Sequence, residues 1–223
     1  MRRRRLLATG LAAVACWSAA TPAAATADEE LDYRWSLGGI LGTLARIVLP
    51  GNGEGRLTTR PVDGGRLAIE LVVTSREGAQ GDYWRYAALI EPASGRTVSA
   101  ESAYRYGEKS KERRADLGQE QVIDVASGIH LVRSRRPQSP VNLSIWSDGK
   151  IYPVVIEPRG WKSVSLAAGR RRAELFAIRP RSVPGQRPWS GRIDLYIEEG
   201  ESARPVAIVV DRRWAKVELE LVD

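Results

Sequence analysis

The chain has 223 residues and a formal net charge of +7, but four of its 34 basic residues are Arg2–Arg5. Without the first 27 residues, 30 Lys and Arg remain against 27 acidic residues, so the charge falls to +3 and gives little support to nucleic-acid binding. The only cysteine is Cys16. Residues 28–223 therefore hold no disulfide, and they depend on an ordinary hydrophobic core, which a chain of this length can bury.

Residues 1–27 have the three parts of a secretory signal peptide. Arg2–Arg5 precede the small apolar run Leu6–Ala20, and Ala25-Thr26-Ala27 forms an A-x-A end. The apolar run is shorter than the roughly 20 residues that a membrane-spanning helix needs. We therefore expect a signal peptide over 1–27 and a periplasmic domain over 28–223, which makes cytoplasmic nucleotide, cofactor and nucleic-acid roles poor first choices.

The signal segment also allows an alternative to simple cleavage, which is lipidation of a cysteine. Ala13-Val14-Ala15-Cys16 resembles a bacterial lipobox, in which Cys16 would carry lipid and anchor the protein to a membrane. The apolar run continues past Cys16, and the bulky Trp17 is an unusual neighbour for a lipidated cysteine. Cleavage after Ala27 is therefore the preferred interpretation, with a lipoprotein anchored through Cys16 as the alternative.

The rest of the chain is dominated by period-two alternation, which is typical of half-buried antiparallel strands. The clearest strands are predicted at Arg66–Thr74, Val141–Ser147, Arg192–Glu198 and Ala215–Leu221. Less regular strands are predicted at Leu31–Ser36, Ile40–Leu49, Tyr83–Glu91, Arg96–Ala100, Lys150–Glu157, Trp161–Leu166, Arg172–Ile178 and Pro205–Val210. Turn residues separate most of them: Pro50-Gly51-Asn52-Gly53, Asp63-Gly64-Gly65, Ser147-Asp148-Gly149, Pro158-Arg159-Gly160 and Glu199-Gly200-Glu201. The pattern predicts a mainly all-β fold, either a strongly curved antiparallel sheet or a partly open barrel.

One segment has helical spacing instead. In Asp124–Arg136 the apolar Val125, Ile129 and Val132 recur at near-helical intervals, and Asp124 is a suitable N-cap. Arginines gather at the other end, where a helix favours positive charge. We expect one short helix here, between an N-terminal and a C-terminal β half.

Landmarks along the chain resemble those of a known family. They are a Tyr/Trp strand with a Gly-rich bend (Tyr33, Trp35, Gly38, Gly39, Gly42), an Asp-x-x-Ser helix start leading to Leu-x-Arg (Asp124, Ser127, Leu131, Arg133), a Lys-x-Tyr-x-Val strand (Lys150, Tyr152, Val154) and a closing Pro-Val (Pro205, Val206). In order and spacing these resemble the domain-of-unknown-function 3108 family of exported Gram-negative bacterial proteins. The chain departs in its Arg-rich loops and in lacking an acidic pair before Pro205. The resemblance implies a curved, mostly antiparallel β domain of the cell envelope. It implies no particular activity and brings no catalytic residues to this chain.

The sequence gives little support to a hydrolase triad or to a metal site. Asp124, Ser127 and His130 are the residue types of a hydrolase triad, but on one helix His130 cannot easily bridge both partners, so a helix cap is the simpler interpretation. With one histidine and no cysteine after the signal, only carboxylate metal sites remain. The acidic groups at residues 28–32 and 198–201 look the same as a solvated tail and turn, so neither a metal nor a cofactor is expected.

The remaining candidates are aromatic and basic residues that could hold a ligand. Trp84 and Tyr86 lie in a strand with apolar residues on both faces, as Trp146 does, and such a strand could line a cavity. Basic residues cluster at 109–114, 133–136, 170–172 and 179–187, where they could meet anionic head groups. We therefore expect a non-enzymatic envelope protein that binds an apolar or lipid-like ligand, with Arg133 and Arg135 near its head group. The alternatives are a protein-interaction or scaffold domain and, less favoured, a hydrolase built on Ser127 and His130.

Overall fold

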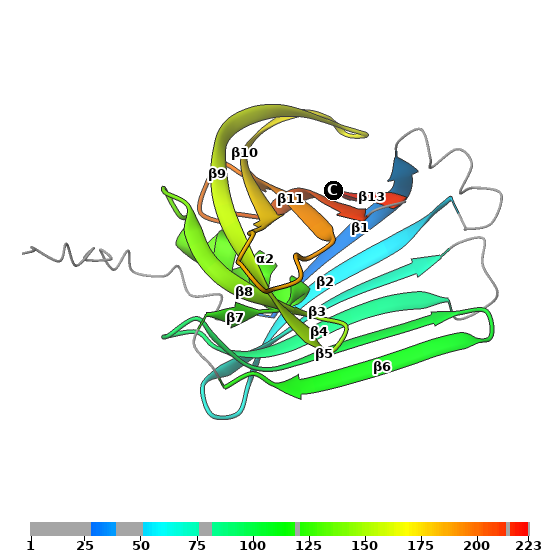
Figure 1. Cartoon of the computed structure of the whole chain (residues 1–223). Coiled ribbons are helices and arrows are strands. Elements are labelled where there is room, and N and C mark those ends of the chain that lie inside the picture. Colours follow the sequence, from blue (N-terminus) through cyan, green and yellow to red (C-terminus); the bar gives the residue numbers. More distant parts are fainter. Residues whose placement is uncertain (1–27, 39–50, 76–81, 119–120, 213–214, 223) are drawn as a thin grey trace, which may run out of the picture.

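Thirteen strands form one curved sheet in the computed structural model, which describes residues 28–38, 51–75, 82–118, 121–212 and 215–222 (Figure 1). Residues 1–27 and the expected strand Ile40–Leu49 lie outside the described residues. The first half of the sheet contains β1 Glu29–Gly38, β2 Asn52–Val62, β3 Arg66–Ser75, β4 Tyr83–Glu91, β5 Arg96–Tyr106, β6 Lys109–Asp116 and β7 Val122–Ile123. The second half contains β8 Val141–Ser147, β9 Lys150–Leu166, β10 Gly169–Pro180, β11 Gly191–Glu198, β12 Pro205–Arg212 and β13 Ala215–Leu221. Between the halves lies the single helix among the described residues, α2 Val125–Arg135.

The strand order is β6-β5-β4-β3-β2-β1-β13-β12-β11-β10-β9-β8-β7, with antiparallel pairing throughout except between β7 and β8. This arrangement confirms the expected curved, mainly β fold. The predictions of strands at Tyr83–Glu91 and Val141–Ser147 are confirmed, with the expected bounds. The sheet curves around one continuous core and is not closed into a barrel, because β6 and β7 at its two ends are not paired with each other.

The two ends of the sheet meet through side chains instead of a ladder. Ile123 and Ile145 pair with each other and belong to the main core, so Val122 and Trp146 point to the opposite face of β7 and β8. There they form a second hydrophobic cluster with Ala100 of β5 and with Leu117. Trp146 is 4% exposed in this cluster. Its large apolar surface therefore holds the two ends of the sheet together.

The helix fills one end of the concave face, which we call the inner face, where it packs against β3, β4 and β7 (Figure 1). Its cap is as the sequence indicates. The Asp124 carboxylate accepts hydrogen bonds from the backbone N–H groups of Ala126 and Ser127, and the Ser127 hydroxyl accepts one from the backbone N–H of Asp124. This reciprocal pairing satisfies donors that the first helical turn would otherwise leave unpaired. The helix ends at Arg136, which adopts a left-handed backbone conformation.

Strand β2 was not anticipated, and the turn predicted at Pro50-Gly51-Asn52-Gly53 is wrong in its second half, because β2 begins at Asn52. Gly53 lies opposite Trp35, whose indole crosses it to donate a hydrogen bond of 2.7 Å to the carbonyl of Thr74. A Cβ atom on Gly53 would lie 1.9 Å from that carbonyl oxygen and 2.3 Å from the Trp35 Nε1. The glycine is therefore a packing position inside a strand, as close approach of a neighbouring side chain requires.

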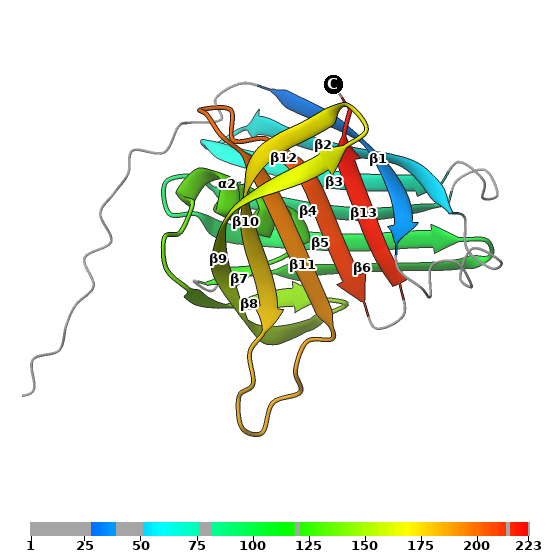
Figure 2. The ribbon, with the colours of Figure 1, turned by 90° about the horizontal axis from the view of Figure 1, so that it is seen from above.

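The expected turn at Pro158-Arg159-Gly160 is wrong. These residues lie within the 17-residue strand β9, where they form a bulge opposite the step from Glu174 to Phe176 of β10. Proline lacks the ladder donor and Gly160 has a φ of 71°, which suits an extra residue in a bulged strand. The bulge bends the far part of the β9–β10 hairpin, which Figures 1 and 2 show as a yellow loop arching across the sheet near β13 and the C-terminus.

Candidate functional site

A row of large apolar side chains crosses the inner face at the end of the sheet away from α2. Trp84 of β4 makes an edge-on contact with Trp35 of β1, with ring centroids 6.2 Å apart, and stacks on Tyr106 of β5 at 6.5 Å. Further along, Leu37 of β1 pairs with Val217 of β13, and Val217 pairs with Val210 of β12. Together with Tyr86, these residues are called the inner strip: Trp35, Leu37, Trp84, Tyr86, Tyr106, Val210 and Val217.

The inner strip is buried at its centre and half-exposed at both ends. Trp35 and Leu37 are 3% and 6% exposed. In contrast, Trp84, Tyr86, Val210 and Val217 are only partly buried, although all four pack against the main core. A concave apolar surface that stays partly open to solvent is the usual character of a small-molecule site. The inner strip is therefore the candidate site for an apolar group among the described residues.

Of the five residues expected at a ligand site, the structure places Trp84 and Tyr86 in the inner strip and the other three elsewhere. Trp146 belongs to the cluster that joins the sheet ends. Arg133 makes two bonds to the Glu29 carboxylate, at 2.6 and 2.8 Å, and a third of 3.0 Å to the carbonyl of Ala203. Arg135 donates to the carbonyl of Ser94, in the turn between β4 and β5. Both arginines thus tie the end of α2 to other parts of the chain.

The hydroxyl of Ser127 takes part in the helix cap. It donates to the Asp124 carboxylate at 2.6 Å and accepts from the Thr97 hydroxyl at 3.1 Å, and Ser127 is 3% exposed. Burial raises the pKa of Asp124 above its ordinary value, although the hydrogen bonds that it accepts oppose this effect. The three residues therefore join the start of α2 to β5 with buried polar contacts.

His130 lies one turn further along α2, beside Arg133 and Glu29. Burial, with a smaller effect of the Arg133 charge, lowers the pKa of His130 from 6.5 to about 4. The imidazole is therefore neutral near physiological pH. The charged groups that act on this imidazole, Arg133 and Glu29, form an ion pair with each other. The Ser127 hydroxyl has its partners in Asp124 and Thr97.

We expect His130 to make the fold less stable in acid. Between pH 6.5 and about 4 the unfolded chain binds a proton at His130 while the folded chain does not, so stability is full above 6.5 and is lost as the pH falls. The loss attributable to this residue is at most about 3 kcal/mol. Urea unfolding of the wild type and His130→Gln, above and below pH 6.5, measures it. An equal loss in both proteins would contradict this origin, because glutamine does not titrate.

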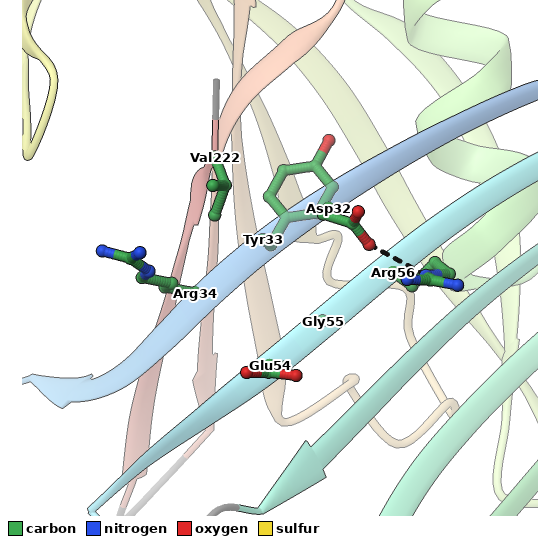
Figure 3. Close-up of a pocket in the computed structure, with 7 residues that line it drawn as sticks. All are labelled: Asp32, Tyr33, Arg34, Glu54, Gly55, Arg56 and Val222. Carbon is green, nitrogen blue, oxygen red and sulfur yellow. Dashed lines mark hydrogen bonds and ion pairs between the residues drawn. The ribbon is translucent and has the colours of Figure 1, made fainter.

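A shallow depression of about 220 Å³ lies on the outer, convex face of β1 and β2. Figure 3 shows its lining, which includes charged side chains of both signs: Asp32, Arg34, Glu54 and Arg56. Arg56 is held by Asp32 and Glu30, each at 2.8 Å. Since these charges already compensate one another at the surface, the depression offers little to a ligand of either sign.

Two further observations concern the described residues as a group. Among them, no set of three or more His, Cys, Asp or Glu side chains could hold a metal ion. Within the same ranges, no helix is long and apolar enough to cross a membrane.

Comparison with known proteins identifies no family for this chain. No protein-family model matches the chain, and no curated protein matches it. Among solved structures it is similar to a beta-barrel-like protein of domain of unknown function 1849 from Brucella abortus, at 12% identity and a TM-score of 0.46, over 87% of this chain and 95% of that one. The expected membership of the domain-of-unknown-function 3108 family is therefore not supported. Of what that resemblance implies, the curved, mainly antiparallel β fold is confirmed.

Proposed function

We propose that this protein is a non-enzymatic binding protein of the periplasm that holds an apolar or lipid-like ligand against the inner strip. The proposal for location rests on the signal-peptide pattern of residues 1–27, with anchoring through Cys16 as the alternative. The proposal for binding rests on the inner strip alone. A cofactor plays no part in it.

The observation that carries the proposal is the partial exposure of inward-facing apolar residues. Trp84 pairs with Val73 and Tyr86 with Leu71, and both partners are core residues, so the two aromatic rings point toward the interior. Leaving rings of this size open to water costs about 25 cal/mol for each Å² of apolar surface. A ligand that covers them would recover that free energy, since the strip is already in place before binding.

Native mass spectrometry of the protein, isolated gently after expression of the whole precursor in a Gram-negative host, tests this proposal. We expect adducts of lipid size on the mature protein. In parallel, titration with the fluorescent fatty acid cis-parinaric acid measures binding directly. In Val217→Lys the ammonium would stand on the inner face, so we expect affinity to fall about tenfold or more.

The matched control is Val62→Lys, because Val62 also lies in a strand but is 40% exposed and belongs to no core cluster. It should bind the probe as the wild type does. Far-UV circular dichroism of both variants establishes that they are folded. A bare protein mass together with equal probe affinity in all three proteins would overturn the proposal.

An envelope interaction or scaffold domain is the second candidate, and one observation favours it. Strand β6 pairs with β5 on one side and has no strand on its other side among the described residues. A free edge can accept a strand from another protein. However, β6 is rich in charged side chains, with Lys109, Lys111, Arg113 and Arg114 among its eight residues, and charge on an edge strand opposes such pairing. Crosslinking in envelope extracts, compared between the wild type and a variant with proline at Ser110, would detect a partner at this edge.

A further inference from the structure

The bent part of the β9–β10 hairpin, residues 159–172, carries positive charge without any negative charge, and we call it the arm. It contains five basic residues and no acidic one: Arg159, Lys162, Arg170, Arg171 and Arg172. Three of the five pair with carboxylates outside the arm: Arg159 with Glu157 at 2.5 Å, Arg171 with Glu198 at 3.6 Å and Arg172 with Glu199 at 3.6 Å. Lys162 and Arg170 have no ion-pair partner among the described residues. The arm is therefore a local positive surface on a protein of low net charge.

One face of the arm is fastened to the outer face of the sheet. Val164 packs against the main hydrophobic cluster, and Leu166 belongs to it at 9% exposed. This cluster also has members on the outer face, such as Ala207, which pairs with Glu220. The backbone N–H of Ala167 at the tip donates to the Glu220 carboxylate of β13 at 3.3 Å. Glu220 alternates with the core residues Leu219 and Leu221, so it lies on the outer face. Figure 2 shows the arm lying across this part of the sheet.

The opposite face of the arm is open to solvent and combines tryptophan with arginine. Ser163 pairs with Arg172 and Ser165 with Arg170, so these four residues share a face with Trp161. Trp161 is 39% exposed, which is unusual for so large an apolar side chain, and the Arg172 guanidinium stands over its ring at 4.7 Å. Both serines and both arginines of this face are exposed. The arm is thus held in position by one face while the other presents an aromatic ring among cations.

We propose that this open face docks the protein on an anionic phospholipid bilayer. Tryptophan is enriched where hydrocarbon meets water, because its ring is apolar and its N–H is polar. Arginine pairs with lipid phosphates through two parallel hydrogen bonds and is attracted by a negative surface. A soluble polyanion would use the same cations but would gain little from Trp161. The coincidence of the ring and the charges on one fastened face therefore favours a membrane surface, and this inference does not depend on the inner strip.

Sedimentation of the mature protein with vesicles tests the docking surface. We expect binding to vesicles of phosphatidylglycerol and phosphatidylcholine and much weaker binding to phosphatidylcholine alone. Arg170→Glu combined with Arg172→Glu should reduce the partition coefficient about tenfold or more. Trp161→Ser should reduce it several-fold without changing the net charge.

The matched control reverses two exposed arginines of the sheet outside the arm, Arg66→Glu and Arg192→Glu, which change the net charge by the same amount. This control should keep most of the vesicle binding. Equal losses in the control and the arm variant would overturn the proposal, as would equal binding to neutral vesicles. Binding to heparin that resists Trp161→Ser, without vesicle binding, would assign the arm to a soluble polyanion instead. The inner-strip variant Val217→Lys should bind vesicles normally, so failure of one proposal is distinguishable from failure of the other.

Discussion

Replacing Arg133 with alanine is expected to destabilise the fold by about 3 kcal/mol, because it leaves a partly buried carboxylate without its cation. The side chains of Arg133 and Glu29 are 11% and 26% exposed, and two hydrogen bonds join them. The same guanidinium donates to the carbonyls of Ala203 and Ser202. One side chain therefore connects the end of α2 with β1 and with the turn between β11 and β12. Urea unfolding followed by circular dichroism measures the loss.

A double-mutant cycle separates two contributions to the free energy of unfolding: the penalty of leaving the Glu29 carboxylate unpaired and the net stabilisation by the ion pair. In Arg133→Met with Glu29→Leu both charges are gone, so we expect much of the lost stability to return. Arg60→Ala is the matched control, because Arg60 is 60% exposed and its carboxylate partner lies 3.9 Å away. It should change the free energy of unfolding by less than about 1 kcal/mol. A loss in Arg133→Ala no larger than that of the control would show that these contacts do not stabilise the fold.

The second large effect is expected at Gly53, where alanine should cost about 3 kcal/mol or more. The added methyl group cannot coexist with the indole of Trp35 or the carbonyl of Thr74, so β1, β2 and β3 must separate locally or the indole must leave its position. The hydrogen bond from Trp35 to Thr74 would be lost in either case. Thermal unfolding measures the cost, and tryptophan emission reports the new environment of the ring.

Gly118→Ala serves as the comparison for Gly53→Ala. A Cβ atom at Gly118 meets nothing within 4 Å, and the backbone there is not left-handed. Stability should change little, and the tryptophan emission should stay as in the wild type. Similar melting temperatures for both alanine variants would contradict the close packing of Trp35 over β2.

The strands whose alternation is regular were predictable, because a half-buried strand needs only its own residues to show its two faces. Val141–Ser147 and Ala215–Leu221 are of this kind. The helix was predictable for the same local reason, since Asp124 caps it three residues before Ser127. Strand β6 was not, because an edge strand with charged residues along its length has no apolar face to read.

The candidate site was predictable only in part. Apolar residues on both faces of β4 directed attention to Trp84 and Tyr86, which do lie in the inner strip. In the sequence, Arg133 and Arg135 looked equally free to bind the head group of a ligand. Their partners, Glu29 and Ser94, are 104 and 41 residues away along the chain, so no local pattern could show that both side chains are already engaged.

Neighbouring residues specify the β character of this protein, its short helix and the turns at Asp63-Gly64-Gly65 and Asp148-Gly149, because alternation, capping and a preference for left-handed backbone are local properties. The curvature of the sheet, and the side-chain cluster through which its two ends meet, depend on tertiary contacts. Pro158-Arg159-Gly160, predicted as a turn, forms a bulge in β9 because the pairing with β10 continues on both sides of that segment. The arm and the inner strip follow from that curvature, which depends on contacts between residues far apart in the chain.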